Sequence, residues 1–307
     1  HQEMDLHKIP LFRVLVENQE VKKATIHFII SGLILDGWSV DLLIQQIQMA
    51  YLGESLPEIE IADYKEYAKA MVDYKNTFWY EDDSRYFEQL IQKYPPREFT
   101  FPFLTLPENI KKAKSNTVTI KIGNDVWNGV KEYCKQAQVT PFVLSMTIFS
   151  YIINKYTGLE QFYLNIPSGV RSEEVENIEH TIGLCSNFIL FPITIKRELS
   201  LAENARINQD RMFDIQEHIF YPGTDAIRYM QKVYNMAMAA PVVFTSMLEF
   251  GLKKENDFYK TGWNIHTNQV MMEADLIYLN KEACISISYV QNLFDSRMIE
   301  KMAKMFV

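Results

Sequence analysis

Hydroxyl and carboxyl side chains gather at the ends of two apolar segments of the sequence. Residues 241–246 form an apolar run that ends in the hydroxyls of Thr245 and Ser246. Residues 267–275 end in two acids, Glu273 and Asp275. Hydroxyl and carboxyl groups positioned together transfer protons in general acid–base catalysis. Hydroxyls on a strand also often serve only to satisfy the backbone, and acids at a strand end are often simply solvated, so both interpretations stay open for each segment.

A third polar segment lies where an early strand is expected to turn into a helix. Residues 31–39 include Ser31, Asp36 and Ser39. Such turns bring backbone amides and short polar side chains to a cleft. The simpler alternative is a capped turn in which Asp36 bonds local amides. Further along, Arg171 lies in a loop that is otherwise acidic and contains glycine. An arginine there pairs with a carboxylate or lies free on the surface.

Several common site types are absent from the sequence. It contains no phosphate-binding glycine loop, nucleophile elbow or zinc-protease motif, and no His and Cys residues have metal-ligand spacing. We therefore expect no metal. The 31 basic and 39 acidic residues give a net charge of −8, which argues against nucleic-acid binding. Three scattered cysteines and the lack of a long apolar run predict a cytoplasmic protein that does not enter a membrane.

The periodicity of apolar residues predicts the elements that position these side chains. Ser39 is expected to cap the helix after the first turn, and Thr140 followed by a proline is expected to start another. The order of elements predicts a mixed α/β protein with two lobes. The predicted boundaries are 1–100 for an N-terminal lobe, 101–114 for a linker and 115–307 for a C-terminal lobe. Strands are predicted at 23–31, 117–122, 161–167, 186–195, 241–247, 266–279 and 283–290, and helices at 39–52, 61–73, 80–93, 125–137, 140–156, 200–218, 224–236 and 295–306.

The order and spacing of these segments resemble the condensation superfamily of nonribosomal peptide synthetases, and most closely its heterocyclization domains. Those domains carry the motif DxxxxDxxS where ordinary condensation domains carry HHxxxDG. Asp36 and Ser39 match the second Asp and the Ser of DxxxxDxxS. The run PVVFTS at 241–246 also resembles that subfamily. Thr267, Gln269 and Val270 resemble its TPQVxLD motif, and Arg171, twelve residues before Gly183, fits its LNxTxxxR…G pattern.

Some motif positions depart from the family pattern. Ser31 replaces the first motif Asp, and Gly32 stands where ordinary condensation domains carry their catalytic His. Glu273 replaces the Asp of TPQVxLD, and Leu184 stands at the Asp of another family motif. The opening motifs of the N-terminal lobe are missing, so the chain is expected to begin partway through that lobe.

The resemblance implies a fold of two chloramphenicol-acetyltransferase-like lobes in a V-shaped pseudo-dimer with a central tunnel. It implies upstream and downstream peptidyl carrier protein domains as partners, together with a neighbouring adenylation domain. The domain itself would bind no cofactor, and the phosphopantetheine arms of the carriers would tether the substrates. The activity that the resemblance implies is joining an acyl or peptidyl thioester to a carrier-bound Cys, Ser or Thr, with or without cyclodehydration of the product to a thiazoline or oxazoline.

By the same resemblance, Thr245 and Glu273 are the catalytic residues. The tunnel residues are Ser31, Ser39, Ser246 and Gln269, and a structural ion pair joins Asp36 to Arg171. The replaced motif positions suggest a catalytically divergent domain that only condenses, only cyclises or only docks carrier proteins. A weaker alternative is a stand-alone acyltransferase of the chloramphenicol-acetyltransferase group, which relies on the His missing at Gly32.

Overall fold

The computed structural model describes residues 4–20, 23–56, 58, 60–99, 101, 114–171, 175–236, 238, 240–248, 258–265, 267 and 270–307. The chain forms two compact units. Unit 1 comprises the chain up to Tyr74 together with the excursion Gly169–Ser186, and unit 2 comprises Lys75–Ser168 and Asn187–Val307. The chain therefore leaves unit 2 at Gly169 and returns to it at Asn187.

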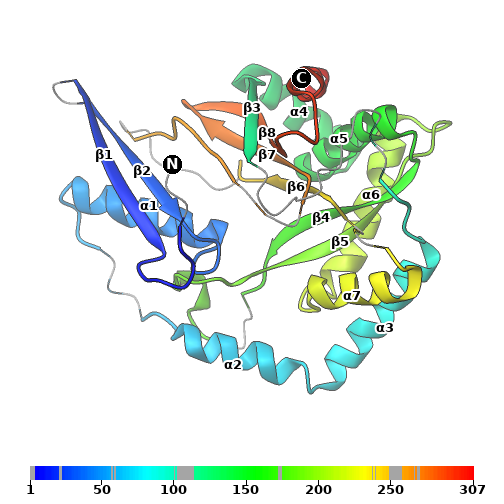
Figure 1. Cartoon of the computed structure of the whole chain (residues 1–307), viewed down its shortest axis with the longest axis horizontal. Helices are drawn as coiled ribbons and strands as arrows, with labels where there is room; N and C mark the ends of the chain where they lie inside the picture. Colours follow the sequence, from blue (N-terminus) through cyan, green and yellow to red (C-terminus); the bar gives the residue numbers. More distant parts are fainter. Residues whose placement is uncertain are drawn as a thin grey trace. The chain divides into compact units, whose positions relative to one another are not determined.

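A two-stranded antiparallel sheet opens unit 1 (Figure 1). In it, β1 (Phe12–Glu20) pairs with β2 (Lys23–Ile30). The sequence predicts a half- to fully buried β2, but its residues are exposed or half-buried. Strand β1 was not expected from the sequence, since it contains three consecutive apolar residues, Val14, Leu15 and Val16, all of which are exposed. Such a run lacks the alternation that marks a strand with one buried face.

Two helices complete unit 1: α1 (Gly37–Tyr51) and α2 (Tyr64–Tyr74). The excursion Gly169–Ser186 contains a short 3₁₀ helix at Ile178–His180. Tyr67 of α2 forms a small buried cluster with Val175, Ile178 and Cys185. This cluster attaches the excursion to a helix that lies far earlier in the sequence.

Unit 2 is built on a six-stranded mixed sheet, and the predicted α/β class is confirmed. In spatial order its strands are β3 (Ser115–Lys121), β8 (Glu282–Val290), β7 (Met272–Leu279), β6 (Val242–Ser246), β4 (Gln161–Gly169) and β5 (Ser186–Thr194). Strand β8 is antiparallel to β3 and β7, whereas β6 is parallel to β7 and β4.

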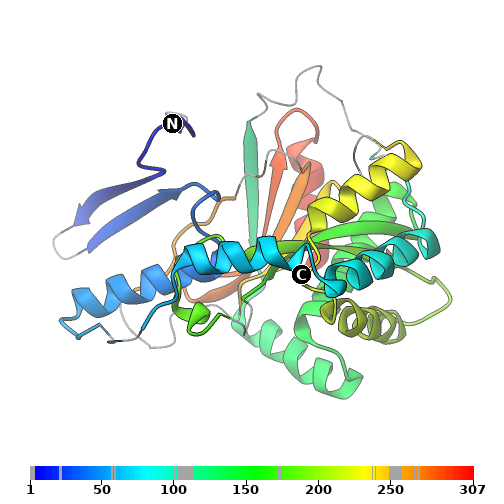
Figure 2. The ribbon, with the colours of Figure 1, turned by 90° about the horizontal axis from the view of Figure 1, so that it is seen from below.

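The described part of unit 2 also contains six helices: α3 (Phe78–Lys93), α4 (Asn124–Ala137), α5 (Pro141–Thr157), α6 (Leu201–Gln216), α7 (Gly223–Tyr234) and α8 (Ser296–Phe306). The predicted start of α5 is confirmed, because the Thr140 side chain accepts a hydrogen bond from the Val143 N–H and Pro141 follows as the first helical residue. Figure 2 shows α3 and α7 side by side. Helix α5 contacts β6, and α8 contacts β8 and the edge strand β3.

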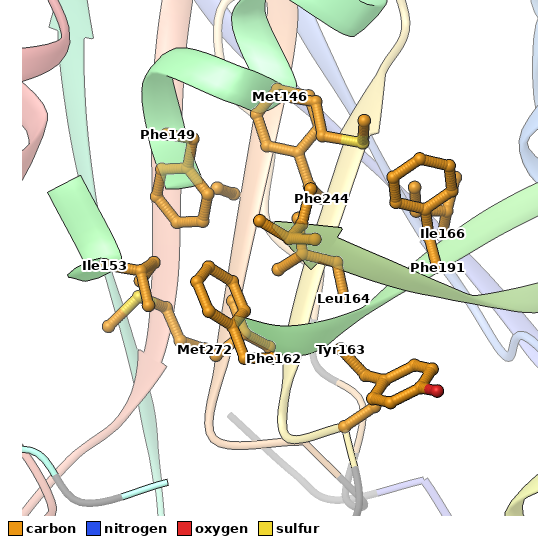
Figure 3. Close-up of a cluster of buried hydrophobic side chains, with 14 of the residues drawn as sticks. Met146, Phe149, Ile153, Phe162, Tyr163, Leu164, Ile166, Phe191, Phe244 and Met272 are labelled. Atoms are coloured by element: carbon orange, nitrogen blue, oxygen red, sulfur yellow. The ribbon is translucent and has the colours of Figure 1, made fainter. Parts of the chain in front are cut away.

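The core of unit 2 fixes which face of the sheet each strand residue occupies. The ring centroid of Phe244 in β6 lies 5.5 Å from that of Phe149 in α5 (Figure 3). It lies 5.6 Å from the ring centroid of Phe142, also in α5. Burying a side chain of this size contributes roughly 1.5–3 kcal/mol. Because side chains alternate along a strand, Val243 and Thr245 must lie on the opposite face of β6.

The compact units do not coincide with the residue ranges expected for two lobes. Helix α3, expected in an N-terminal lobe, contributes Phe87 and Ile91 to the unit 2 core. The expected linker at 101–114 lies almost entirely outside the described residues, so those lobe boundaries stay a prediction. The predicted strand at 266–279 is too long, because β7 begins at Met272.

No single helix in the described part of the chain is long and apolar enough to cross a membrane. Helices α4 and α5 qualify by length and composition only as a pair, and the pair is bent by 101° at its break.

Candidate functional site

Asp36 caps the N-terminus of α1. Its Oδ1 accepts a hydrogen bond from the Ser39 N–H at 2.8 Å. The sequence-based assignment of Ser39 as the cap is wrong, because α1 begins at Gly37 and Ser39 lies within its first turn. A carboxylate here satisfies a backbone donor that has no partner within the helix, and it complements the helix dipole. The capped turn expected as the simpler interpretation is present.

Arg171 forms a bidentate ion pair with Asp36. Its Nη1 donates to Oδ2 at 2.9 Å, and its Nη2 donates to Oδ1 at 3.1 Å. The two side chains are only 10% and 2% exposed. The Cys185 N–H also donates to Oδ2, at 3.0 Å. The ion pair implied by the family resemblance is therefore present, and it holds the excursion Gly169–Ser186 against the start of α1.

Ser39 belongs to the same network. Its Oγ donates to the Gly183 carbonyl at 2.8 Å and accepts from the Gly183 N–H at 3.0 Å. The Nη2 of Arg171 donates to the same oxygen at 3.1 Å. Ser39 was expected to line a tunnel, but the structure places it fully buried among these partners.

Gly183 is surrounded closely in unit 1. A Cβ at this position would lie 2.4 Å from Cδ2 of Tyr64, so any side chain would collide with that ring. The Tyr64 hydroxyl donates to the Leu184 carbonyl at 3.1 Å. The close approach of the Tyr64 ring therefore requires glycine here.

Ser31 and Gly32 form the turn between β2 and α1. The Ser31 Oγ accepts from the Leu33 N–H at 3.3 Å, and the Ser31 carbonyl accepts from the Ile34 N–H at 3.1 Å. A Cβ at Gly32 would meet no atom within 4 Å. The turn therefore has room for a side chain at Gly32, where ordinary condensation domains carry histidine, but no imidazole is present there. Ser31 likewise places a hydroxyl, and no carboxylate, at the first motif position.

Thr245 and Glu273 lie on the same face of neighbouring parallel strands in unit 2. The register pairs Val243 with Glu273 and Thr245 with Asp275. Glu273 is thus a diagonal neighbour of Thr245, and Asp275 is its direct partner. Thr245 is half-buried, Glu273 is 5% exposed and Asp275 is fully buried. The predicted catalytic pair is on one face, but a second acid stands closer in register to the hydroxyl.

Ser246 does not join this group. The register pairs it with Leu276, which lies in the core beneath α5, so its side chain leaves the sheet on the face opposite to Thr245. Its Oγ accepts from the Leu248 N–H at 3.5 Å. The two adjacent hydroxyls are therefore separated by the sheet.

Burial governs the electrostatics of the two acids. Desolvation raises the pKa of Glu273 to about 7, opposed by the Thr267 hydroxyl, which donates to Oε2 at 3.4 Å. Desolvation, and then the like charge of Glu273, raises the pKa of Asp275 well above its ordinary value. Carboxyl groups poised near neutrality are suited to proton transfer. Gln269, expected to line the tunnel, lies outside the described residues.

Paired hydroxyls, which were not expected from the sequence, continue the polar face beyond β7. The Oγ atoms of Ser288 and Thr117 lie 3.0 Å apart, as do those of Ser286 and Thr119. The register places Ser288 opposite Glu273 and Ser286 opposite Asp275. The available signal was the alternation of hydroxyl residues at 117 and 119 and at 286 and 288.

Metal ligands are not assembled in the described part of the chain. It holds no group of three or more His, Cys, Asp or Glu side chains that could bind a metal ion.

Comparisons with known proteins agree with the fold. The condensation domain family matches residues 1–307. Bacitracin synthase 1 of Bacillus licheniformis is 24% identical over 97% of this chain, which spans 6% of that protein. The EpoB NRPS cyclization-docking bidomain from Sorangium cellulosum aligns with a TM-score of 0.84 at 19% identity, and the alignment covers 100% of this chain and 63% of the EpoB chain. The first condensation domain of the calcium-dependent antibiotic synthetase aligns with a TM-score of 0.74 at 12% identity, and the alignment covers 96% of this chain and 66% of the synthetase chain.

These likenesses to solved structures show the fold, and the family match extends over the whole sequence. The chain therefore belongs to the condensation domain family.

Proposed function

We propose that the chain is a heterocyclization-type condensation domain of a nonribosomal peptide synthetase. It joins a carrier-bound acyl or peptidyl thioester to the amine of a carrier-bound Cys, Ser or Thr. The side-chain thiol or hydroxyl then attacks the new amide, and loss of water gives a thiazoline or oxazoline. Its partners are the upstream and downstream peptidyl carrier proteins, whose phosphopantetheine arms deliver the substrates, and an adenylation domain that loads the acceptor.

The observation that carries this proposal is the placement of Thr245 and Glu273 on one face of neighbouring strands. Dehydration of the cyclic intermediate needs one proton delivered to a leaving hydroxyl and one removed from nitrogen. A buried carboxyl group whose pKa lies near 7 serves both directions near neutrality. The likeness in fold to a domain described as a cyclization domain supports the same reading.

The buried network of unit 1 supports a positioning role for the turn. The side chains of Asp36 and Ser39 are engaged in hydrogen bonds to Arg171, Gly183, Cys185 and their own helix. The proposal therefore assigns the proton transfers to unit 2 and the maintenance of backbone geometry to unit 1.

Reconstitution with two loaded carrier proteins tests the proposal. One carrier bears an acetyl thioester and the other bears Cys, Ser or Thr in separate reactions, and intact mass follows the bound product. We expect amide formation followed by loss of one water. We expect Thr245→Ala and Glu273→Gln each to reduce the loss of water by on the order of 100-fold.

Ser150→Ala is the matched control, because its Oγ donates only to the Met146 carbonyl of its own helix, at 2.7 Å. We expect this variant to form product like the unaltered domain. The absence of any amide with all three acceptors would contradict the proposal. If both Thr245→Ala and Glu273→Gln instead leave product formation intact in the full assembly line, where other domains are present, a domain that only docks carriers is favoured.

A further inference from the structure

A row of polar side chains crosses four strands of the unit 2 sheet at the level of Thr245. The register places Thr245 of β6 opposite Asp275 of β7, Asp275 opposite Ser286 of β8, and Ser286 opposite Thr119 of β3. Directly paired residues on neighbouring strands are separated by little more than the spacing of the strands, about 4.8 Å. Asp275 is thus the acid beside Thr245, and Glu273 lies two residues away on the same face.

The described surroundings of Asp275 offer its carboxyl group no hydrogen bond that would compensate for its removal from water. The side chain is fully buried, and neither Oδ1 nor Oδ2 has a hydrogen-bond partner among the described residues. An ionised carboxylate in such a position is strongly disfavoured, so the group keeps its proton. Burial and the neighbouring Glu273 accordingly raise its pKa well above the ordinary value.

Among the described residues, other titratable groups lie further from Thr245 on this face. Cys284 lies two residues from Ser286 on β8, and burial raises the pKa of its thiol. Lys121 of β3 pairs with Glu282 of β8 at 2.5 Å. In the described part of the segment that follows β6, the ammonium of Lys260 lies 5.5 Å from the Trp263 ring centroid. Glu273 is the charged group that contributes to the raised pKa of Asp275.

We propose that Asp275 is a positioning residue for the cyclodehydration step, a neutral acid that supplies a proton through the Thr245 hydroxyl while Glu273 accepts one. This inference rests on the proposed function. It separates the two acids by role: Asp275 holds the proton to be donated, and Glu273, which is slightly exposed, receives the proton that the substrate releases.

The step balances in protons and bonds. The Thr245 hydroxyl gives its proton to the hydroxyl of the cyclic intermediate, the C–O bond breaks and water leaves. Thr245 takes a replacement proton from Asp275. The two side chains are not hydrogen-bonded in the absence of substrate, so this transfer requires them to close to hydrogen-bond distance when the intermediate is bound. The N–H bond of the ring breaks as the C=N bond forms, and the Glu273 carboxylate accepts that proton. Transfer from Glu273 back to Asp275 restores both groups, and no oxidant or metal is required.

The pH dependence of ring formation tests this assignment. The full protein reacts with an acetyl-loaded carrier and a Cys-, Ser- or Thr-loaded carrier, and the amide and ring products are quantified separately across neutral and alkaline pH. We expect a bell-shaped profile, because Glu273 must be ionised and Asp275 protonated. We expect Asp275→Asn to retain amide formation, to slow ring formation by on the order of 10- to 100-fold, and to lose the alkaline limb.

A second variant covers the case in which Asp275→Asn fails to fold. Thr245→Val interrupts the proposed relay without touching either acid, and we expect it to lose the same alkaline limb, whereas Thr245→Ser retains it. An unchanged profile and rate in Asp275→Asn, or a retained alkaline limb in Thr245→Val, would overturn the assignment while leaving the proposed function intact. An unaltered domain that forms no ring with any acceptor would overturn the proposed cyclodehydration itself.

Discussion

Asp36 and Arg171 are separated by 135 positions in the sequence and are joined by two hydrogen bonds of 2.9 and 3.1 Å. Both side chains are almost fully buried. Removing one partner leaves the other as an uncompensated buried charge, which typically costs about 3–5 kcal/mol. We therefore expect Arg171→Ala and Asp36→Asn each to lower the free energy of unfolding by about that amount, measured by urea denaturation.

The control for this prediction is Lys135→Ala. Lys135 pairs with Glu132 at 2.7 Å, but the two side chains are 72% and 67% exposed. Exposed pairs of this kind contribute about 0–1 kcal/mol. Equal losses in Lys135→Ala and Arg171→Ala would show that the buried pair does not hold unit 1 together.

Replacing glycine by alanine is expected to have opposite effects on stability at Gly183 and at Gly129. A Cβ at Gly183 would lie 2.4 Å from the Tyr64 ring, whereas one at Gly129, inside α4, meets nothing within 4 Å. Overpacking typically costs about 1–3 kcal/mol, and Gly→Ala in a helix interior gains up to about 1 kcal/mol. We expect Gly183→Ala to lower the unfolding midpoint and Gly129→Ala to raise it. A Gly183→Ala variant as stable as the unaltered chain would contradict the prediction.

The elements of the fold could be predicted where apolar periodicity and helix caps are strong. Thr140 and Pro141 mark the start of α5 correctly, because a cap and a first-turn proline act locally. Ser39 was misassigned because Asp36, three residues earlier, has an equally suitable cap side chain and the helix starts directly after it. Strand β1 could not be predicted because its apolar residues are not buried on one face.

The candidate site could be predicted only in part, for a similar reason. Motif positions singled out Thr245 and Glu273, and the structure places them on one face of the sheet. Adjacent hydroxyls in the sequence suggested that Ser246 acts with Thr245, but strand alternation separates them. The direct partner of Thr245 depends on the register between β6 and β7, which no local pattern specifies.

The buried acids of β7 predict a dependence of stability on pH. Burial raises the pKa of Glu273 to about 7 and the pKa of Asp275 well above its ordinary value. The fold therefore favours the protonated acids. That stabilisation is complete below the pKa of the unfolded chain and is lost as the pH rises through the pKa of the folded chain. We expect the free energy of unfolding to fall between about pH 5 and about pH 8.

Neutral isosteres identify the source of this dependence. The Gln and Asn side chains of Glu273→Gln and Asp275→Asn carry no charge at any pH. We therefore expect the free energy of unfolding of each variant to change less with pH than that of the unaltered chain, when urea unfolding is measured at both ends of the interval. Glu132→Gln is the control, because Glu132 is 67% exposed and its loss should leave the profile unchanged. Stability that rises over the same interval would show that other groups dominate.

Thr245 and Ser246 provide a comparison between two neighbouring hydroxyls on opposite faces of β6. Thr245 shares its face with Glu273 and Asp275, whereas Ser246 pairs in register with the core residue Leu276. A group that transfers protons must lie within hydrogen-bond reach of its partners. We therefore expect Thr245→Ala to slow ring formation by on the order of 100-fold and Ser246→Ala to slow it less than about 3-fold, measured by intact mass of the carrier-bound product. Comparable losses in both variants would mean that the strand positions its neighbours through packing, and that the face on which a hydroxyl lies does not decide its role.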